Sequence, residues 1–227
     1  LNSAGHFAER HGLIVIIALG ESVVAIGVGV VSEPISWPII AATILGLVVA
    51  GCLWWAYFDV ASIVAERVLR RLQGEERARL ARDAYSYLHL PMVAGVALLA
   101  LGIEQVLEHV GESSHRELAE PLPMLALGAL YAGTALFLFA HAAFKYRTWG
   151  QLTLRRIAVG VVICAMIPFV SGLPALAALA VLTLVMVAMI ASEAVRYSEV
   201  REQIRHEDVG PEAHRTHTAT DPSAEDP

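Results

Sequence analysis

The hydrophobic residues of this chain gather in long blocks separated by short polar stretches. We delimit six blocks, at about residues 12–31, 36–58, 84–103, 122–143, 157–172 and 174–192. A helix rises ~1.5 Å per residue, so about 20 residues cross the hydrocarbon core of a bilayer. With 56% hydrophobic and 17% charged residues and a mean hydropathy of +0.59, the composition is that of a membrane protein. The pattern predicts an all-α fold, a polytopic transmembrane helix bundle with six spans in a domain over residues 1–196.

The fifth block is the least regular of the six. Pro168, Gly172 and Pro174 crowd its end, and proline and glycine interrupt helices. A re-entrant hairpin over residues 157–192 is therefore the alternative to two full spans.

The basic residues predict the orientation of the bundle, because cytoplasmic loops are enriched in Lys and Arg. In a six-span arrangement with both ends cytoplasmic, fifteen of the sixteen fall on one side, and Arg116 is the exception. The fifteen precede the first span, lie between the second and third or the fourth and fifth spans, or follow the sixth: Arg10, Arg67, Arg70, Arg71, Arg77, Arg79, Arg82, Lys145, Arg147, Arg155, Arg156, Arg196, Arg201, Arg205 and Arg215.

The two ends of the chain differ in character. Residues 197–227 are polar and contain Pro211 and Pro222, which is typical of a disordered cytoplasmic tail. The chain begins at Leu1, and its first apolar block is too long and too polar at its centre for a signal peptide. We therefore expect a fragment whose upstream part, and any helices in it, are missing.

Composition and motifs argue against several classes of function. The net charge of −6 comes from a local excess of acidic residues and says little about partners, and nothing in the sequence suggests binding of nucleic acid. The run His6-x-x-Glu9-x-His11 matches no metalloprotease pattern, and no catalytic nucleophile arrangement or CxxC pair is present. We therefore predict no metal, no cofactor and no enzymatic activity.

Glu21 is the outstanding candidate for function. It lies in the middle of Gly12 to Val31, a stretch that is otherwise free of charge. A carboxylate at the centre of a bilayer costs ~2.5–3.5 kcal/mol on insertion scales, so such residues usually face a protein interior or a watery cavity. The alternative is a structural carboxyl that is hydrogen-bonded across helices.

Other polar residues cluster at the cytoplasmic ends of the predicted spans. We interpret them as the lining of a vestibule that opens to the cytoplasm and ends at Glu21; ordinary helix-end groups are the alternative for the shallow ones. The candidates for transport or binding are Glu21, His89, Glu9, Arg10, His6, Asp59 and His141.

Three segments carry a family resemblance. They are residues 6–13 running into Leu19-Gly20-Glu21-Ser22, the aromatic run 53–59, and Tyr87-Leu88-His89-Leu90-Pro91 with Gly95. Together they resemble the bacterial low-temperature-requirement A family of membrane proteins, over about residues 5–196. The resemblance implies a multi-pass protein of the bacterial plasma (inner) membrane, with further spans upstream that include a helix containing Phe-Phe-Asp. The family name records a requirement for growth in the cold and supplies no substrate.

Three functions follow as hypotheses. The first is a transporter in which Glu21 couples a proton or cation to a small solute within the lipid bilayer. The alternative is a non-transporting protein that supports membrane organisation or complex assembly in the cold. A membrane enzyme with His89 and Glu21 as an acid–base pair ranks last, because the two differ in depth by roughly 7 Å of helix rise.

Overall fold

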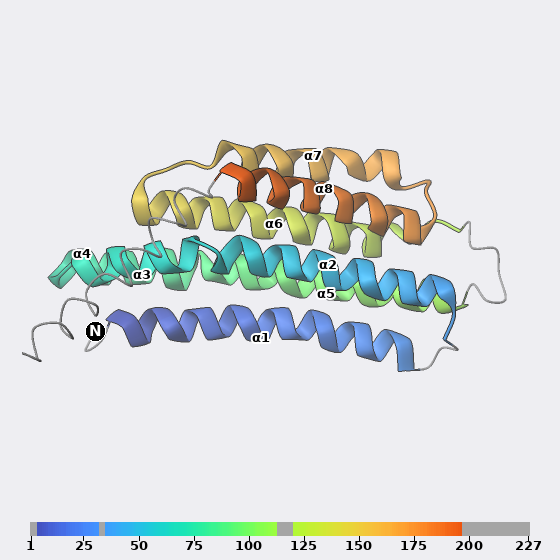
Figure 1. The fold of residues 1–227 in the computed structure, drawn as a ribbon, viewed down its shortest axis with the longest axis horizontal. Helices are drawn as coiled ribbons and strands as arrows, with labels where there is room; N and C mark the ends of the chain where they lie inside the picture. The colour runs from blue at the N-terminus through green and yellow to red at the C-terminus, as the bar shows by residue number, and fades with distance from the viewer. Residues whose placement is uncertain (1–3, 32–34, 113–119, 197–227) are drawn as a thin grey trace, which may run out of the picture. The chain divides into compact units, whose positions relative to one another are not determined.

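The computed structural model describes residues 4–31, 35–112 and 120–196, and they are almost entirely helical (Figure 1). Two compact units divide the chain, residues 1–190 and 191–227, and only the end of the last helix is described in the second. The helices are α1 (Ala4–Val31), α2 (Trp37–Phe58), α3 (Ala61–Arg71), α4 (Gly74–Leu80), the π-helix η1 (Ala81–Tyr87), α5 (His89–Glu112), α6 (Met124–Trp149), α7 (Leu154–Val170) and α8 (Ala175–Arg196).

The predicted all-α class is confirmed, and a helix occupies each of the six predicted spans. Five helical segments are long and apolar enough to cross a membrane. The remaining helix, α7, which occupies the fifth predicted span, has 17 residues. That is about 25 Å of helix and near the short limit for a span. Residues 157–192 thus form two separate helices, while the predicted tail at 197–227 lies outside the described residues.

Helix α5 is the centre of the packing in residues 4–190. It lies against α1 on one side and against α6 on the other, and α7 in turn packs on α6 (Figure 1). Glycines let α5 and α6 approach closely: a Cβ placed on Gly95 would lie 2.7 Å from the Gly133 carbonyl oxygen, and one on Gly102 would lie 2.6 Å from the Leu130 nitrogen. Backbones at this separation need residues without side chains.

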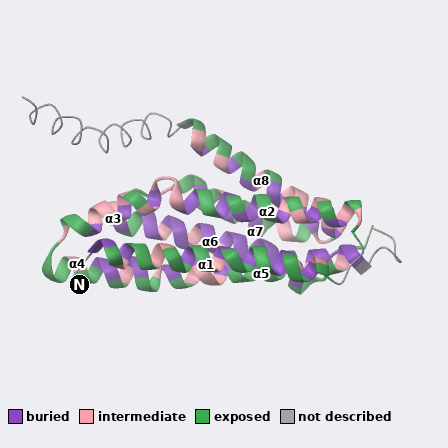
Figure 2. Cartoon of the chain, turned by 60° about the horizontal axis from the view of Figure 1, so that its bottom comes forward, coloured by how far each residue is buried: buried purple, intermediate pink, exposed green. Residues whose placement is uncertain are grey.

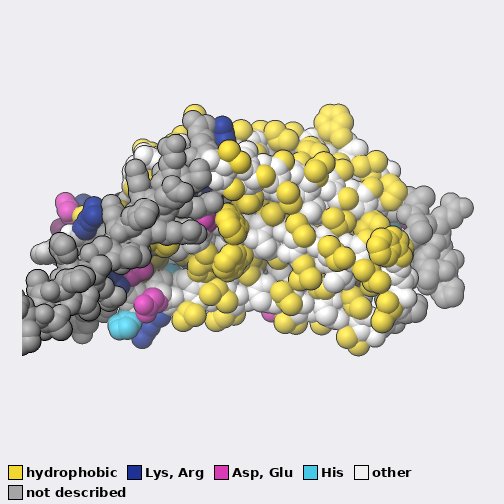
Figure 3. Space-filling model, viewed as in Figure 1, with side chains coloured by type: hydrophobic (Ala, Val, Ile, Leu, Met, Phe, Trp, Pro, Cys, Tyr) yellow, Lys and Arg dark blue, Asp and Glu magenta, His cyan; other side chains and the backbone are white. Residues whose placement is uncertain are grey.

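The outward faces of the long helices carry many hydrophobic side chains. Buried and exposed positions alternate around each helix (Figure 2), and exposed hydrophobic side chains are spread along the surface of the bundle in Figure 3. Exposed tryptophans mark both ends of α2, with Trp37 at one end and Trp54 and Trp55 at the other. Indole rings favour the headgroup region of a bilayer, so their spacing of about 26 Å along the helix fits a membrane span.

Charged side chains gather at the end of the bundle that holds the start of α1, α3, α4 and the end of α6 (Figure 3). Helix α3 buries Ala61, Ala65 and Leu69, four residues apart, and leaves its arginines on the other faces. An ion pair of 3.0 Å between Asp83 of η1 and Arg147 of α6 holds two elements of this end together.

Candidate functional site

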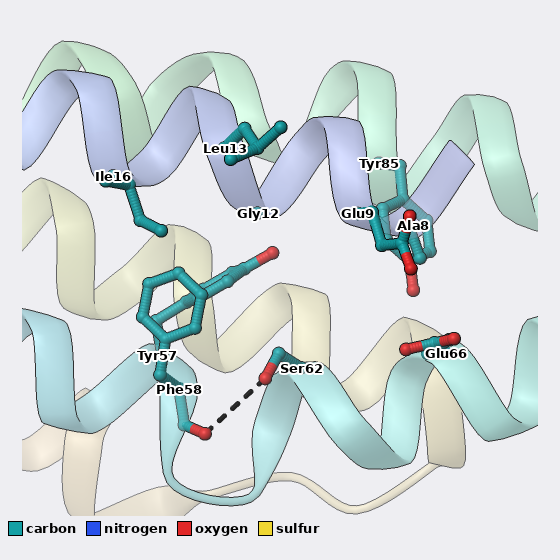
Figure 4. A pocket seen from close by; sticks show the side chains of 10 residues that line it. All are labelled: Ala8, Glu9, Gly12, Leu13, Ile16, Tyr57, Phe58, Ser62, Glu66 and Tyr85. Carbon is teal, nitrogen blue, oxygen red and sulfur yellow. Dashed lines mark hydrogen bonds between the residues drawn. The ribbon is translucent and has the colours of Figure 1, made fainter. Parts of the chain in front are cut away.

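A cavity of about 420 Å³ lies at this charged end, between α1, the α2–α3 junction and η1 (Figure 4). It opens at Glu9, whose side chain is 60% exposed, and reaches inward to Tyr57 and Tyr85, which are buried. The lining residues are Ala8, Glu9, Gly12, Leu13, Ile16, Tyr57, Phe58, Ser62, Glu66 and Tyr85.

Two carboxylates give the cavity its charge. Glu66 of α3 binds Arg70 one turn further along the helix, at 2.8 and 2.5 Å, and Glu9 of α1 binds His6 at 3.1 Å. These basic partners lie outside the lining, which contains no lysine, arginine or histidine. The polar part of the cavity wall is therefore acidic.

Behind the cavity, Tyr57 and His89 form a buried hydrogen-bonded pair. The Tyr57 hydroxyl lies 2.8 Å from His89 Nε2, and His89 Nδ1 lies 3.1 Å from the Ala84 carbonyl oxygen. Because a carbonyl can only accept, Nδ1 carries a proton, and in the neutral imidazole Nε2 then accepts the hydrogen bond that Tyr57 donates. The two partners thus select one tautomer of the neutral ring.

The π-helix before His89 explains why this pair forms. Pro91 has no N–H to give to the carbonyl one turn earlier, and the helix accommodates it with a π-helical segment in which the Leu88 N–H bonds to Asp83, five residues back. The irregular segment thus lies just ahead of the proline, at Ala81–Tyr87. The carbonyl of Ala84, inside this segment, receives the His89 side chain.

Tyr85 of the π-helix closes the inner wall of the cavity. Its ring stacks on His89, with centroids 5.4 Å apart and planes 10° from parallel. The residue is 2% exposed, and its hydroxyl has no hydrogen-bond partner within the described chain.

A second buried polar group lies deeper, where α6 and α7 meet the end of α2. Arg156 of α7 donates to the Ala56 carbonyl at 3.1 Å and contacts the ring nitrogens of His141 on α6. The His141 ring lies 6.2 Å from that of Tyr57, between centroids. Buried titratable groups thus continue from the cavity wall towards α7.

The structure separates the residues that the sequence grouped into one vestibule. Glu9 lines the cavity, His6 is bonded to it, and His89 and His141 are buried behind it. Arg10 is exposed, and Asp59 is partly buried at the junction of α2 and α3. Glu21 lies on an exposed face of α1 and outside the cavity lining, so the structure does not bring it together with His89.

Sequence reasoning missed Tyr57, Tyr85, Glu66 and Arg156. Tyr57 lies in the aromatic run that was used only for the family resemblance, and Arg156 was used only to predict the orientation. The signal for Glu66 was available: it follows Ser62 by four residues, so the two share a helix face. That this face turns towards α1 could be learned only from the packing.

Residues 1–191 match the family model described as Bacterial low temperature requirement A protein (LtrA). The chain belongs to this family. The match covers all the helices described above except the last turns of α8, so the cavity and the buried pair lie within the family's domain.

A curated relative adds no function to this assignment. An uncharacterized protein of Rhizobium meliloti (strain 1021) is 32% identical over 109 residues, which are 46% of this chain and 25% of the relative. The match thus spans a quarter of that relative's length. No solved structure matches this LtrA chain significantly. Family membership and the long apolar helices together make the chain an integral, multi-pass membrane protein.

Proposed function

We propose that this LtrA protein is a proton- or cation-coupled transporter. The observation that carries the proposal is the Tyr57–His89 pair at the closed end of an acidic cavity. A hydroxyl that donates to a neutral imidazole can pass a proton on, and chains of acidic residues and histidines are the usual proton relays of membrane transporters. Here Glu9, Glu66 and Tyr57 line the same cavity, and Tyr57 is bonded to His89, so a proton would cross the cavity to reach Tyr57 and pass on to His89.

The proposal includes an orientation and a second ionisable site. The charged end of the bundle, with its arginines, would face the cytoplasm of a bacterial cell, both chain ends included, as the asymmetry of Lys and Arg favours. Glu21 is the predicted intramembrane carrier of the coupling ion. Because Glu21 is exposed on α1, another protein surface would have to pack against this face of α1 for Glu21 to take part in that step.

Flux through proteoliposomes tests the relay. We expect uptake of protons, or of Na⁺ or K⁺, measured with dyes inside the vesicles, and we expect His89→Gln to reduce it at least tenfold. His109→Gln is the matched control, because it alters a histidine at the other end of the same helix. Equal flux in both variants, or none in the unaltered protein, would exclude the relay.

A second candidate function has its own observation. The open face of α1 includes Gly20 and Gly27, where an added Cβ would meet nothing within 4 Å, and the exposed Ile17 and Val24. Small and apolar residues on a helix face are suited to helix–helix contact in membranes. A protein that organises other membrane proteins in the cold would use such a face. This second function predicts that Glu21→Gln leaves every flux unchanged. It also predicts that specific partner proteins co-purify with the chain in native-lipid extracts.

A further inference from the structure

The cavity beside α1 holds a buried polar atom that the chain itself does not satisfy. Tyr85 is 98% buried, given its 2% exposure, and its hydroxyl is unpartnered within the described residues. Figure 4 shows the side chain directed into the cavity, in the region of Glu9 and Glu66. Buried hydroxyls are nearly always hydrogen-bonded, so a ligand in the cavity would complete this one.

The neighbouring carboxylates determine the charge of that ligand. Both Arg70 hydrogen bonds end on Oε1 of Glu66, and His6 bonds to Oε2 of Glu9, so each carboxylate has an oxygen that these partners do not use. The lining has two acidic side chains and no basic one. A positively charged N–H donor fits two carboxylates and a hydroxyl acceptor.

The opposite half of the cavity determines the rest of the ligand. Leu13 and Ile16 of α1 and the ring of Phe58 lie away from the carboxylates, on the other side of the cavity (Figure 4). A bare metal ion would leave this half empty, and the described residues contain no group of three His, Cys, Asp or Glu side chains that could hold one. The volume of about 420 Å³ is within the range of small-molecule sites.

We propose that this cavity binds a primary ammonium group carried on an apolar or aromatic body. The ammonium would bond to Glu66, Glu9 and the Tyr85 hydroxyl, and the body would contact Leu13, Ile16 and Phe58. The inference names the solute class of the proposed transporter and rests on that function only for the step of translocation. The ammonium has two sources, a free amphipathic amine or the headgroup of phosphatidylethanolamine.

Binding is measured by calorimetry with phenethylamine, on the protein in phosphatidylcholine nanodiscs, with empty nanodiscs subtracted. We expect saturable binding of phenethylamine and none of its neutral analogue 2-phenylethanol. Glu66→Gln should weaken binding about tenfold or more, and Tyr85→Phe about threefold to tenfold, as expected for hydrogen bonds to a charged group.

Two matched variants serve as controls. Glu75→Gln alters a carboxylate that pairs with Arg79 just as Glu66 pairs with Arg70, but on α4 and outside the cavity. Tyr87→Phe alters the exposed tyrosine of the same π-helix. Both should bind like the unaltered protein. Tyr85→Phe removes an unpartnered hydroxyl, so it should fold as well as the parent.

Nanodiscs that contain phosphatidylethanolamine separate the two sources. A loss of apparent affinity for phenethylamine there would identify the headgroup as an occupant, and an unchanged affinity would identify the free amine; either supports an ammonium site. Equal binding of 2-phenylethanol, or no difference between Glu66→Gln and Glu75→Gln, would overturn the proposal. Because no gradient is applied, binding without flux would refute transport alone, and flux without binding would refute this inference alone.

Discussion

Tyr57 provides the clearest test at the scale of one residue. Its hydroxyl is the partner of His89 Nε2, and both residues are buried. Tyr57→Phe would leave that nitrogen without a donor, and we expect a loss of about 1–2 kcal/mol in the free energy of unfolding. Unfolding in mixed micelles by titration with dodecyl sulfate measures it. Tyr146→Phe, at an exposed tyrosine of α6, is the control and should leave the free energy of unfolding unchanged. Equal stability of the two variants would show that the Tyr57–His89 hydrogen bond does not stabilise the fold.

Depth in a span singles out residues but does not give their surroundings. His89 lies in the first two turns of the third block and was predicted to line a vestibule, whereas the structure buries it behind the cavity wall, bonded to Tyr57 and the Ala84 carbonyl. That Glu66 faces α1 was not predictable, because its polar helix acquires an inward face only by packing on α1 and α6. Tyr85 lies at the start of the third block, where nothing in the sequence indicates that its hydroxyl faces a cavity. The exposure of Glu21 was likewise hidden, since a single sequence does not reveal which side of a helix meets its neighbours.

The contact between α5 and α6 is the corresponding test at the scale of elements. A Cβ on Gly133 would lie 2.8 Å from the Leu99 nitrogen and 2.9 Å from the Gly95 carbonyl oxygen, and backbone atoms cannot turn away as a side chain can. Gly133→Ala should therefore lower the free energy of unfolding by about 1–3 kcal/mol through overpacking. Gly128→Ala on the same helix meets nothing within 4 Å and should be neutral or slightly stabilising. The free energies of unfolding of both variants are measured by titration with dodecyl sulfate. Equal values would contradict the close contact between α5 and α6 at Gly133.

Helices were easier to predict than their partners. The second block, residues 36–58, matches helix α2, Trp37–Phe58, almost residue for residue. In a membrane the length of an apolar block predicts the length of the helix, because the helix has to cross the hydrocarbon core. The third block begins with a π-helix instead, where Pro91 removes a donor from the regular ladder. Which helix touches which depends on side-chain fit, and of the glycines in blocks three and four Gly95, Gly102 and Gly133 lie at the contact while Gly128 does not.

At the scale of the whole molecule, the position of Glu21 separates the two candidate functions. Its helix face is otherwise apolar, with Ile17 72% and Val28 53% exposed. A carboxyl on such a face meets lipid, water or another protein surface. Each surrounding admits a different reagent, so chemical access distinguishes them.

Carbodiimide labelling of the protein in lipid nanodiscs makes this test. We expect the hydrophobic dicyclohexylcarbodiimide to modify Glu21, as read by mass spectrometry of the peptides, because the reagent dissolves in the bilayer and the described residues leave the carboxyl uncovered. Glu75 and Glu76 of α4, which are exposed at the charged end, should react instead with a water-soluble carbodiimide. Labelling of Glu21 by the water-soluble reagent would contradict the expected lipid exposure and place the residue in an aqueous path. Protection from both reagents would mean that another protein surface covers α1, and the assembly function would then be the better account of this face.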